Sequence, residues 1–165
     1  MSIKNLVFIL PEKYIFKIVD IKPHLIDWEN ISIHQQLSEN FIEKHKNEVS
    51  WYHISIHQEL SEPFIEKYKN RIVWEFISKY QKLSEEFIER FKDRVDWVSI
   101  SAYQTLSESF IEKHADKVYW NAISSNQKLS EEFIKKHKDK LNWLFISRNE
   151  KISDRVKEKV KNYFN

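Results

Sequence analysis

Six tryptophans are the residues of this chain best suited to stacking chemistry. They are its only tryptophans, and each follows the previous one by 23 residues. A row of exposed indoles can stack on nucleic-acid bases or on sugars. An isoleucine follows every tryptophan three positions later, however, which places both on one side of a helix. We therefore interpret the tryptophans as structural core residues, each with its indole N–H bonded to a neighbour: Trp28, Trp51, Trp74, Trp97, Trp120 and Trp143.

Serine and glutamine recur with the same period, four and seven residues after each tryptophan. Such side chains read nucleotides in proteins that bind one base per repeat. A code needs residues that change between repeats, and these do not. We predict a hydrogen-bond ladder that satisfies helix ends or bridges repeats. The glutamine column is Gln35, Gln58, Gln81, Gln104 and Gln127, and Glu150 takes its place in the last repeat.

The histidines are the candidates for metal chemistry. His34 and His57 lie in neighbouring repeats, but two histidines without a nearby acidic or cysteine partner make a poor metal site. Three others occupy a column that elsewhere holds Tyr68 and Phe91, which predicts that they pack as aromatic equivalents. These three are His45, His114 and His137.

Catalytic patterns are missing from the sequence. We find no nucleophile beside a base and no metal-ligand spacing. The chain has no cysteine and no glycine, which excludes thiolate sites and glycine-rich phosphate loops. We expect a protein that is not an enzyme and has no cofactor and no metal.

Two basic columns could form a ridge that attracts nucleic acid. Glutamates run beside them, and the formal net charge is only +2. We interpret the ridge as a solvated face and keep nucleic-acid binding as the alternative. The columns are Lys44, Lys67, Arg90, Lys113, Lys136 and Lys159, and Lys46, Lys69, Lys92, Lys138 and Lys161.

Four positions change between repeats: one, two, five and six residues after each tryptophan. A fixed framework with changing positions is how repeat proteins specify partners, and aromatic residues often dominate binding. The alternative is that some of these residues complete the packing between hairpins. The partner-binding candidates are Tyr52, His53, Phe76, Lys79, Tyr80, Ala102, Tyr103 and Asn126.

The elements that position these residues are two short helices per repeat. The first opens at tryptophan, after a residue suited to N-capping at Asp27, Ser50, Asp96 and Asn142. The second opens at a Leu-Ser-Glu motif, where serine is the N-cap and glutamate complements the helix dipole.

The pattern predicts an all-α solenoid of about six 23-residue helical hairpins, forming a single repeat domain. Residues 1–27 are the predicted N-terminal cap, 28–150 the array and 151–165 the C-terminal capping helix. Lys157 replaces an isoleucine of the other repeats, which suits a face that no further repeat covers.

The unit W-x-x-I-S-x-x-Q-x-L-S-E-x-F-I-E-K resembles the short tandem repeats of giant DNA viruses of amoebae, and Trp74–Val95 carries it with Arg90 in place of the final lysine. Similar repeats occur in other large viruses and phages, and the resemblance covers about residues 25–150. It implies a helical repeat protein without assigned chemistry. Leu10–Val19 resembles the start of an F-box, which implies an adaptor that recruits substrates to ubiquitin ligases.

No segment approaches the roughly 18 apolar residues of a membrane span, so we expect a cytoplasmic protein, in the host cytoplasm if it is viral. The expected function is a non-catalytic scaffold for protein–protein interaction that engages host or viral partners. Nucleic-acid binding along the basic ridge and an F-box-like adaptor role are the alternatives.

Overall fold

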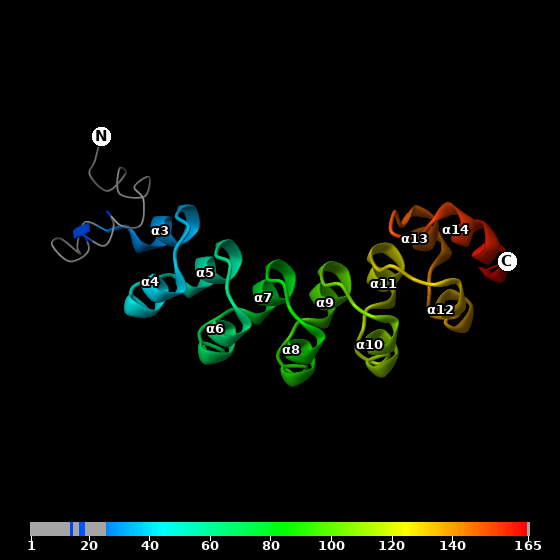
Figure 1. Ribbon diagram of the computed structural model, residues 1–165, viewed down its shortest axis with the longest axis horizontal. Helices are drawn as coiled ribbons and strands as arrows, with labels where there is room; N and C mark the ends of the chain where they lie inside the picture. Colours follow the sequence, from blue (N-terminus) through cyan, green and yellow to red (C-terminus); the bar gives the residue numbers. More distant parts are fainter. Residues whose placement is uncertain (1–13, 15–16, 19–25, 165) are drawn as a thin grey trace. The chain divides into compact units, whose positions relative to one another are not determined.

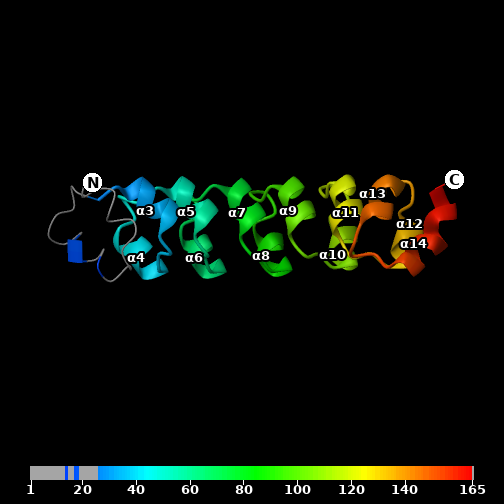
Figure 2. The same ribbon diagram turned by 90° about the horizontal axis from the view of Figure 1, so that it is seen from above.

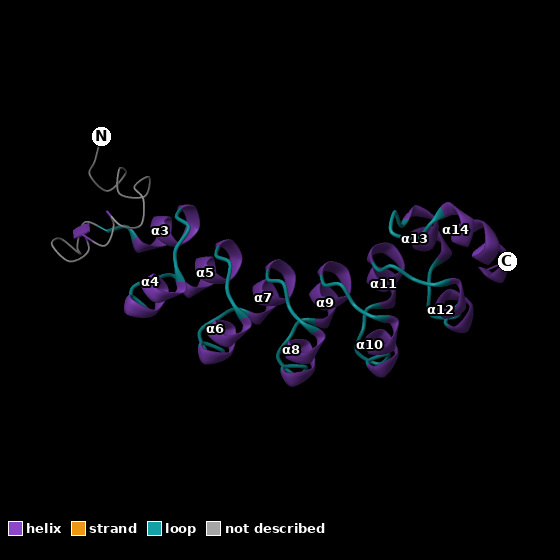
Figure 3. Ribbon diagram, in the orientation of Figure 1, coloured by secondary structure: helices purple, strands orange, loops and turns teal. Residues whose placement is uncertain are grey.

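The computed structural model describes residues 14, 17–18 and 26–164, and within them helices joined by loops are the only regular secondary structure (Figure 3). Twelve α-helices and one 3₁₀-helix make up this part of the chain, which confirms the all-α helical-repeat class. The chain divides into two compact units, residues 1–81 and 82–165. The predicted N-terminal cap and the F-box-like segment fall almost wholly outside the described residues.

The first unit stacks its tryptophan helices side by side. Helix α5 packs on α3 and on α7, while the intervening helices α4 and α6 form a second row (Figures 1 and 2). The bounds are α3 (Trp28–His34), α4 (Glu39–Lys44), α5 (Trp51–His57), α6 (Glu62–Lys67) and α7 (Trp74–Tyr80).

The second unit repeats this arrangement. Helix α11 packs on α9 and on α13, and the terminal helix α14 packs on α12. The bounds are α8 (Glu85–Arg90), α9 (Trp97–Tyr103), α10 (Glu108–Lys113), α11 (Trp120–Asn126), α12 (Glu131–Lys136), α13 (Trp143–Arg148), α14 (Asp154–Val160) and the 3₁₀-helix η2 (Lys161–Phe164).

Capping explains where the helices begin. Five Leu-Ser-Glu serines accept a hydrogen bond from the backbone N–H three residues on, as predicted. Asp27 and Asp96 cap the tryptophan helices in the same way. Ser50 was expected to do so but makes no side-chain cap bond. Its backbone N–H instead donates to Ser32 Oγ of the preceding repeat at 3.1 Å. A side chain of the preceding repeat therefore bonds to the start of this helix.

Helix ends avoid the left-handed backbone that glycine usually supplies. Each first helix ends at a residue in extended conformation, such as Gln58 with φ −100° and ψ 145°. No described residue has a positive φ. The repeat can therefore turn its chain without glycine, in agreement with a glycine-free composition.

Isoleucine columns from both helices form the core. Their side chains are completely buried, which agrees with the core position predicted for those of the second helices. Burial of this kind is the main stabilising contribution in a helix too short to be stable alone. The columns are Ile31, Ile54, Ile77, Ile100, Ile123 and Ile146 in the first helices, and Ile42, Ile65, Ile88, Ile111 and Ile134 in the second.

Candidate functional site

The tryptophans lie at the edge of the core, and all six are half-buried. The indole N–H of Trp97 donates to the Lys92 carbonyl oxygen at 2.9 Å. Its ring centroid lies 4.9 Å from that of His114 and 6.3 Å from that of Phe110. Trp51 and Trp120 repeat this geometry. The expectation of a core position is therefore correct only in part, because the indole packs on the second helix of its hairpin but is only half-buried.

The serine and glutamine columns form the predicted ladder between repeats. Gln127 Nε2 donates to the carbonyl oxygens of Ser101 at 2.9 Å and Gln104 at 2.7 Å. Its Oε1 accepts the Leu106 N–H at 3.1 Å. Ser101 Oγ in turn accepts the Tyr119 N–H at 2.9 Å. Gln58 makes the same three bonds in the first unit, so these polar columns are engaged in holding repeats together.

The last step of the ladder differs from the prediction. Asn149, and not Glu150, donates to the carbonyl oxygens of Ser124 at 2.9 Å and Gln127 at 2.8 Å. Helix α13 is one residue shorter than the other tryptophan helices, so Asn149 occupies the C-cap position. Because the helix is shorter, an asparagine occupies the C-cap position that a glutamine occupies in the other repeats.

Two of the aromatic-column histidines also join neighbouring repeats. His114 Nε2 lies 2.7 Å from Glu89 Oε2, and His137 Nε2 lies 3.0 Å from Glu112 Oε1. Both rings pack against tryptophan as predicted. His57 lies near His53 of its own helix, with ring centroids 5.9 Å apart. No cluster of three or more metal-ligating side chains exists among the described residues.

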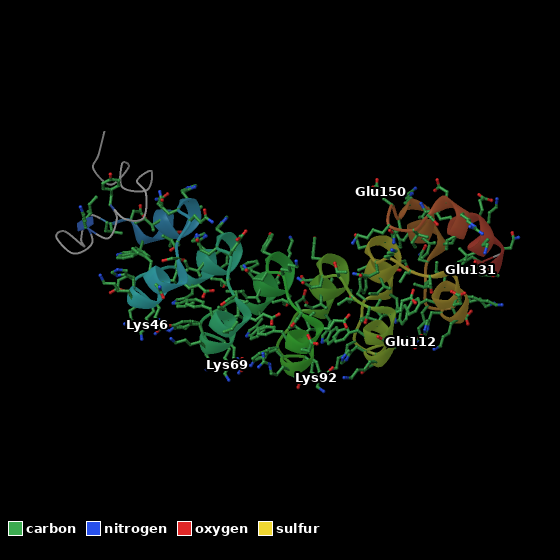
Figure 4. The ribbon with its side chains drawn as sticks, viewed as in Figure 1. Lys46, Lys69, Lys92, Glu112, Glu131 and Glu150 are labelled. Atoms are coloured by element: carbon green, nitrogen blue, oxygen red, sulfur yellow. The ribbon has the colours of Figure 1, made fainter. Side chains whose placement is uncertain are left out.

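Four lysines of the first basic column pair with glutamates of the preceding repeat, and these are Lys67, Lys113, Lys136 and Lys159. Lys113 Nζ lies 3.0 Å from Glu89 Oε2, and Lys136 Nζ lies 2.9 Å from Glu112 Oε1. Lys113, followed by Lys92, lowers the pKa of Glu89 from 4.5 to about 2. Of the second column, Lys46 and Lys69 lie along the second-helix edge of the first unit, away from its tryptophan helices (Figure 4).

A wide, open hollow lies between α8 and α10 in the second unit. Its volume is about 750 Å³. Acidic and basic side chains line it together, and Lys113 pairs with Glu89 inside it. Three glutamates face one arginine and one lysine, so the hollow has charges of both signs and offers no single charge to a ligand. The lining residues are Glu85, Glu86, Glu89, Arg90, Phe110 and Lys113.

The four variable columns differ in exposure. Positions one and six after tryptophan are mostly exposed, whereas positions two and five are mostly half-buried or buried. Tyr52, Tyr80 and Tyr103 are about half exposed. The remaining candidates are half-buried, and these are His53, Phe76, Lys79, Ala102 and Asn126. Positions one and six are therefore accessible to a partner, whereas positions two and five are largely covered by neighbouring side chains.

An aromatic cluster on α5 and α7 gathers five of the candidates in the first unit. The ring of Phe76 lies edge-on to Tyr52 at 5.0 Å and 6.3 Å from Tyr80. His53 lies edge-on to Tyr52 at 5.0 Å. Lys79 Nζ lies 5.0 Å from the centre of the Tyr80 ring. We call Tyr52, His53, Phe76, Lys79 and Tyr80 the aromatic cluster.

The other three candidates belong to the second unit. Ala102 and Tyr103 lie on α9, where Tyr103 is 58% exposed. Asn126 Nδ2 donates to the Ala122 carbonyl oxygen of its own helix at 3.1 Å, which engages its amide locally.

Phe164 is a structural residue that the repeat pattern did not reveal. In the last repeat Val156 and Val160 replace the aromatic residues that pack on tryptophan elsewhere. Phe164 of η2 fills this role, with its ring stacked on Trp143 at 5.6 Å. The loss of both aromatic residues from the last repeat was the signal that a replacement was needed.

Comparison with protein-family models, with curated proteins and with solved structures finds no match to this chain. Among the described residues, no helix is long and apolar enough to cross a membrane.

Proposed function

We propose that this protein is a non-catalytic scaffold that binds a protein partner through the tryptophan-helix surface of its first unit. The observation that carries the proposal is the aromatic cluster. It combines the half-exposed rings of Tyr52 and Tyr80 with the half-buried Phe76 between them. Tyrosines held by neighbouring rings lose little conformational freedom on binding, which is why such residues often dominate binding energy.

The scaffold interpretation also agrees with how the polar columns are used. Serine, glutamine, histidine and glutamate side chains bond to neighbouring repeats. These side chains hold the repeats together. The positions that change between repeats are therefore the ones left to recognise a partner. The resemblance to viral tandem repeats supports a viral protein that engages host or viral partners in the cytoplasm.

The test is affinity purification with the full chain as bait, using substitutions within and outside the aromatic cluster. We expect Tyr52→Ala and Tyr80→Ala each to weaken partner binding by about thirtyfold, the effect of a typical hot spot. Tyr119→Ala is the matched control, since Tyr119 is 48% exposed but lies outside the cluster. Equal recovery with all three variants would contradict the proposal, provided that their thermal unfolding matches the wild type. Tyr103→Ala tests the separate candidate in the second unit.

Nucleic-acid binding remains the alternative, but the ion pairs between lysines and glutamates weaken the case for it. A nucleic-acid complex should lose affinity steeply as salt concentration rises, because counterions are released on binding. Gel shifts at low salt with single- and double-stranded DNA and RNA test this alternative. We expect no shift.

A further inference from the structure

The second unit presents a tryptophan-helix surface almost without charge. Helices α9 and α11 contain no charged residue, and α13 contains only Arg148. Each of the second helices α8, α10 and α12 has at least three charged residues. In a chain with 32% charged residues, an exposed region of three helices with a single charged residue is unusual. Loss of charge at the centre of a surface patch is a mark of protein interfaces.

The exposed column one residue after each tryptophan has an apolar side chain on α9, an amide on α11 and an apolar side chain on α13. Val98 is 53% exposed and Leu144 is 51% exposed, and Asn121 lies between them on the middle helix. The small residues Ala102 and Ser125 follow four positions later on α9 and α11, on the same side of the helices, and Arg148 holds this position on α13 at the edge of the surface. We call Val98, Ala102, Asn121, Ser125 and Leu144 the neutral face.

The side chain of Asn121 makes no hydrogen bond within the part of the chain that the structure describes. The neighbouring Ser125 hydroxyl donates to the Asn121 backbone carbonyl oxygen at 2.6 Å and is thus satisfied within the helix. A primary amide both donates and accepts, so it is complementary to a second amide in the opposite orientation.

We propose that the neutral face binds a second copy of this chain, with the twofold axis near Asn121. The order apolar, amide, apolar is the same in both directions. An antiparallel copy would therefore place Val98 against Leu144 and Asn121 against Asn121, as a twofold interface requires. No like charges meet in this arrangement.

The corresponding column of the first unit is unsuited to the same contact. It contains Glu29, Tyr52 and Glu75. An antiparallel copy would bring Glu29 against Glu75, and like charges across an interface oppose association. Self-association therefore belongs to the neutral face, and it is independent of the partner proposed for the aromatic cluster.

Three helices spaced by about 10 Å give a contact strip roughly 20 Å long between the outer axes. Such a strip is at the small end of specific interfaces, so we expect a dissociation constant of order micromolar. Sedimentation equilibrium of the purified full chain should show a monomer–dimer equilibrium. A wild-type chain that stays monomeric up to about 1 mM would overturn the proposal.

Substitution locates the interface. Asn121→Lys would place two ammonium groups at the axis and should raise the dissociation constant at least tenfold. Asn40→Lys makes the same change at an exposed position of α4 in the first unit and should leave dimerisation unchanged. A dimer that resists Asn121→Lys, or that both changes weaken equally, would contradict the neutral face as the interface. Thermal unfolding of both variants checks that the fold is kept.

Cross-linking tests the register, because the chain has no cysteine of its own. Asn121→Cys should form a disulfide-linked dimer under oxidising conditions, since a disulfide needs Cα atoms about 4.4–6.8 Å apart. Val98→Cys should cross-link to Leu144→Cys in a mixture of the two variants. Cross-linking of Val98→Cys with itself but not with Leu144→Cys would exclude the antiparallel arrangement.

Discussion

Gln127 shows at the scale of one residue how the repeats are joined. It is 1% exposed, and its amide satisfies two carbonyl oxygens and one N–H of the preceding repeat. Buried backbone groups that lose their partners are costly because water cannot replace them. The glutamine column is thus fixed by the backbone that it bonds and not by a ligand.

Replacing Gln127 with alanine should lower the free energy of unfolding by about 3 kcal/mol, since it leaves three backbone groups without their partner. Chemical denaturation measures the loss. Lys128→Ala, at an exposed neighbouring position, should change stability by less than about 0.5 kcal/mol. Equal stability of the two variants would mean that water reaches the ladder.

Trp97 tests the structural role of the tryptophans. Trp97→Ala removes its packing on His114 and Phe110 and should cost about 2–4 kcal/mol. Trp97→Phe keeps a ring but loses the bond to the Lys92 carbonyl oxygen, so it should cost about 1 kcal/mol. Thermal unfolding compares the two. A near-neutral Trp97→Ala would return the tryptophans to the candidates for ligand stacking.

At the scale of elements, second helices are joined through charged side chains on successive repeats. Glu89 of α8 meets both Lys113 and His114 at the end of α10, and Glu112 of α10 meets Lys136 and His137 at the end of α12. The basic column is therefore part of the contact between helices. The positive charge that the sequence predicts for this ridge is therefore offset in the fold by the neighbouring glutamates.

Glu89 should make the second unit sensitive to acid. Its pKa is about 2 in the folded chain, below the ordinary 4.5, so its contribution to stability is complete above pH 4.5 and is lost as the pH falls toward 2. Glu89→Gln should lower the melting temperature at pH 7, and the difference from wild type should shrink between pH 4.5 and 2. Melting curves across this range measure it.

Glu132→Gln is the control for this prediction, because Glu132 is an exposed glutamate of the first turn of α12. The melting temperature of the Glu132→Gln variant should stay close to that of the wild type at every pH. A Glu89→Gln variant that also follows the wild type would show that these ion pairs are fully solvated.

At the scale of the whole molecule, the repeat that begins at Trp143 differs from the others. The last tryptophan helix is shorter, Asn149 takes the glutamine role, and Phe164 returns to cover Trp143. Asn149 keeps the bonds to the preceding repeat, and Phe164 takes the place of the aromatic residues that Val156 and Val160 replace.

Phe164→Ala should destabilise α13 and α14 locally and leave the other helices of the second unit almost unchanged. We expect a loss of about 1 kcal/mol, and faster hydrogen exchange in α13 and α14 while α9 keeps its protection. Tyr163→Ala, at the neighbouring position, is the control and should leave the exchange of α13 unchanged. Uniformly faster exchange throughout the second unit would show that this end is not an independent local element.

The sequence by itself determined the all-α class, the two helices per repeat, the serine caps and the isoleucine core. These features depend on the 23-residue period and on local chemistry such as helix capping, and both recur from repeat to repeat. Only the tertiary structure decided that the tryptophans are half-buried, that Ser50 is held by Ser32, and that Asn149 replaces Glu150 in the ladder. It also separated exposed Tyr52 and Tyr80 from half-buried Phe76. These features depend on contacts between residues about 20 positions apart, where a side chain's surroundings are set by its neighbours in space.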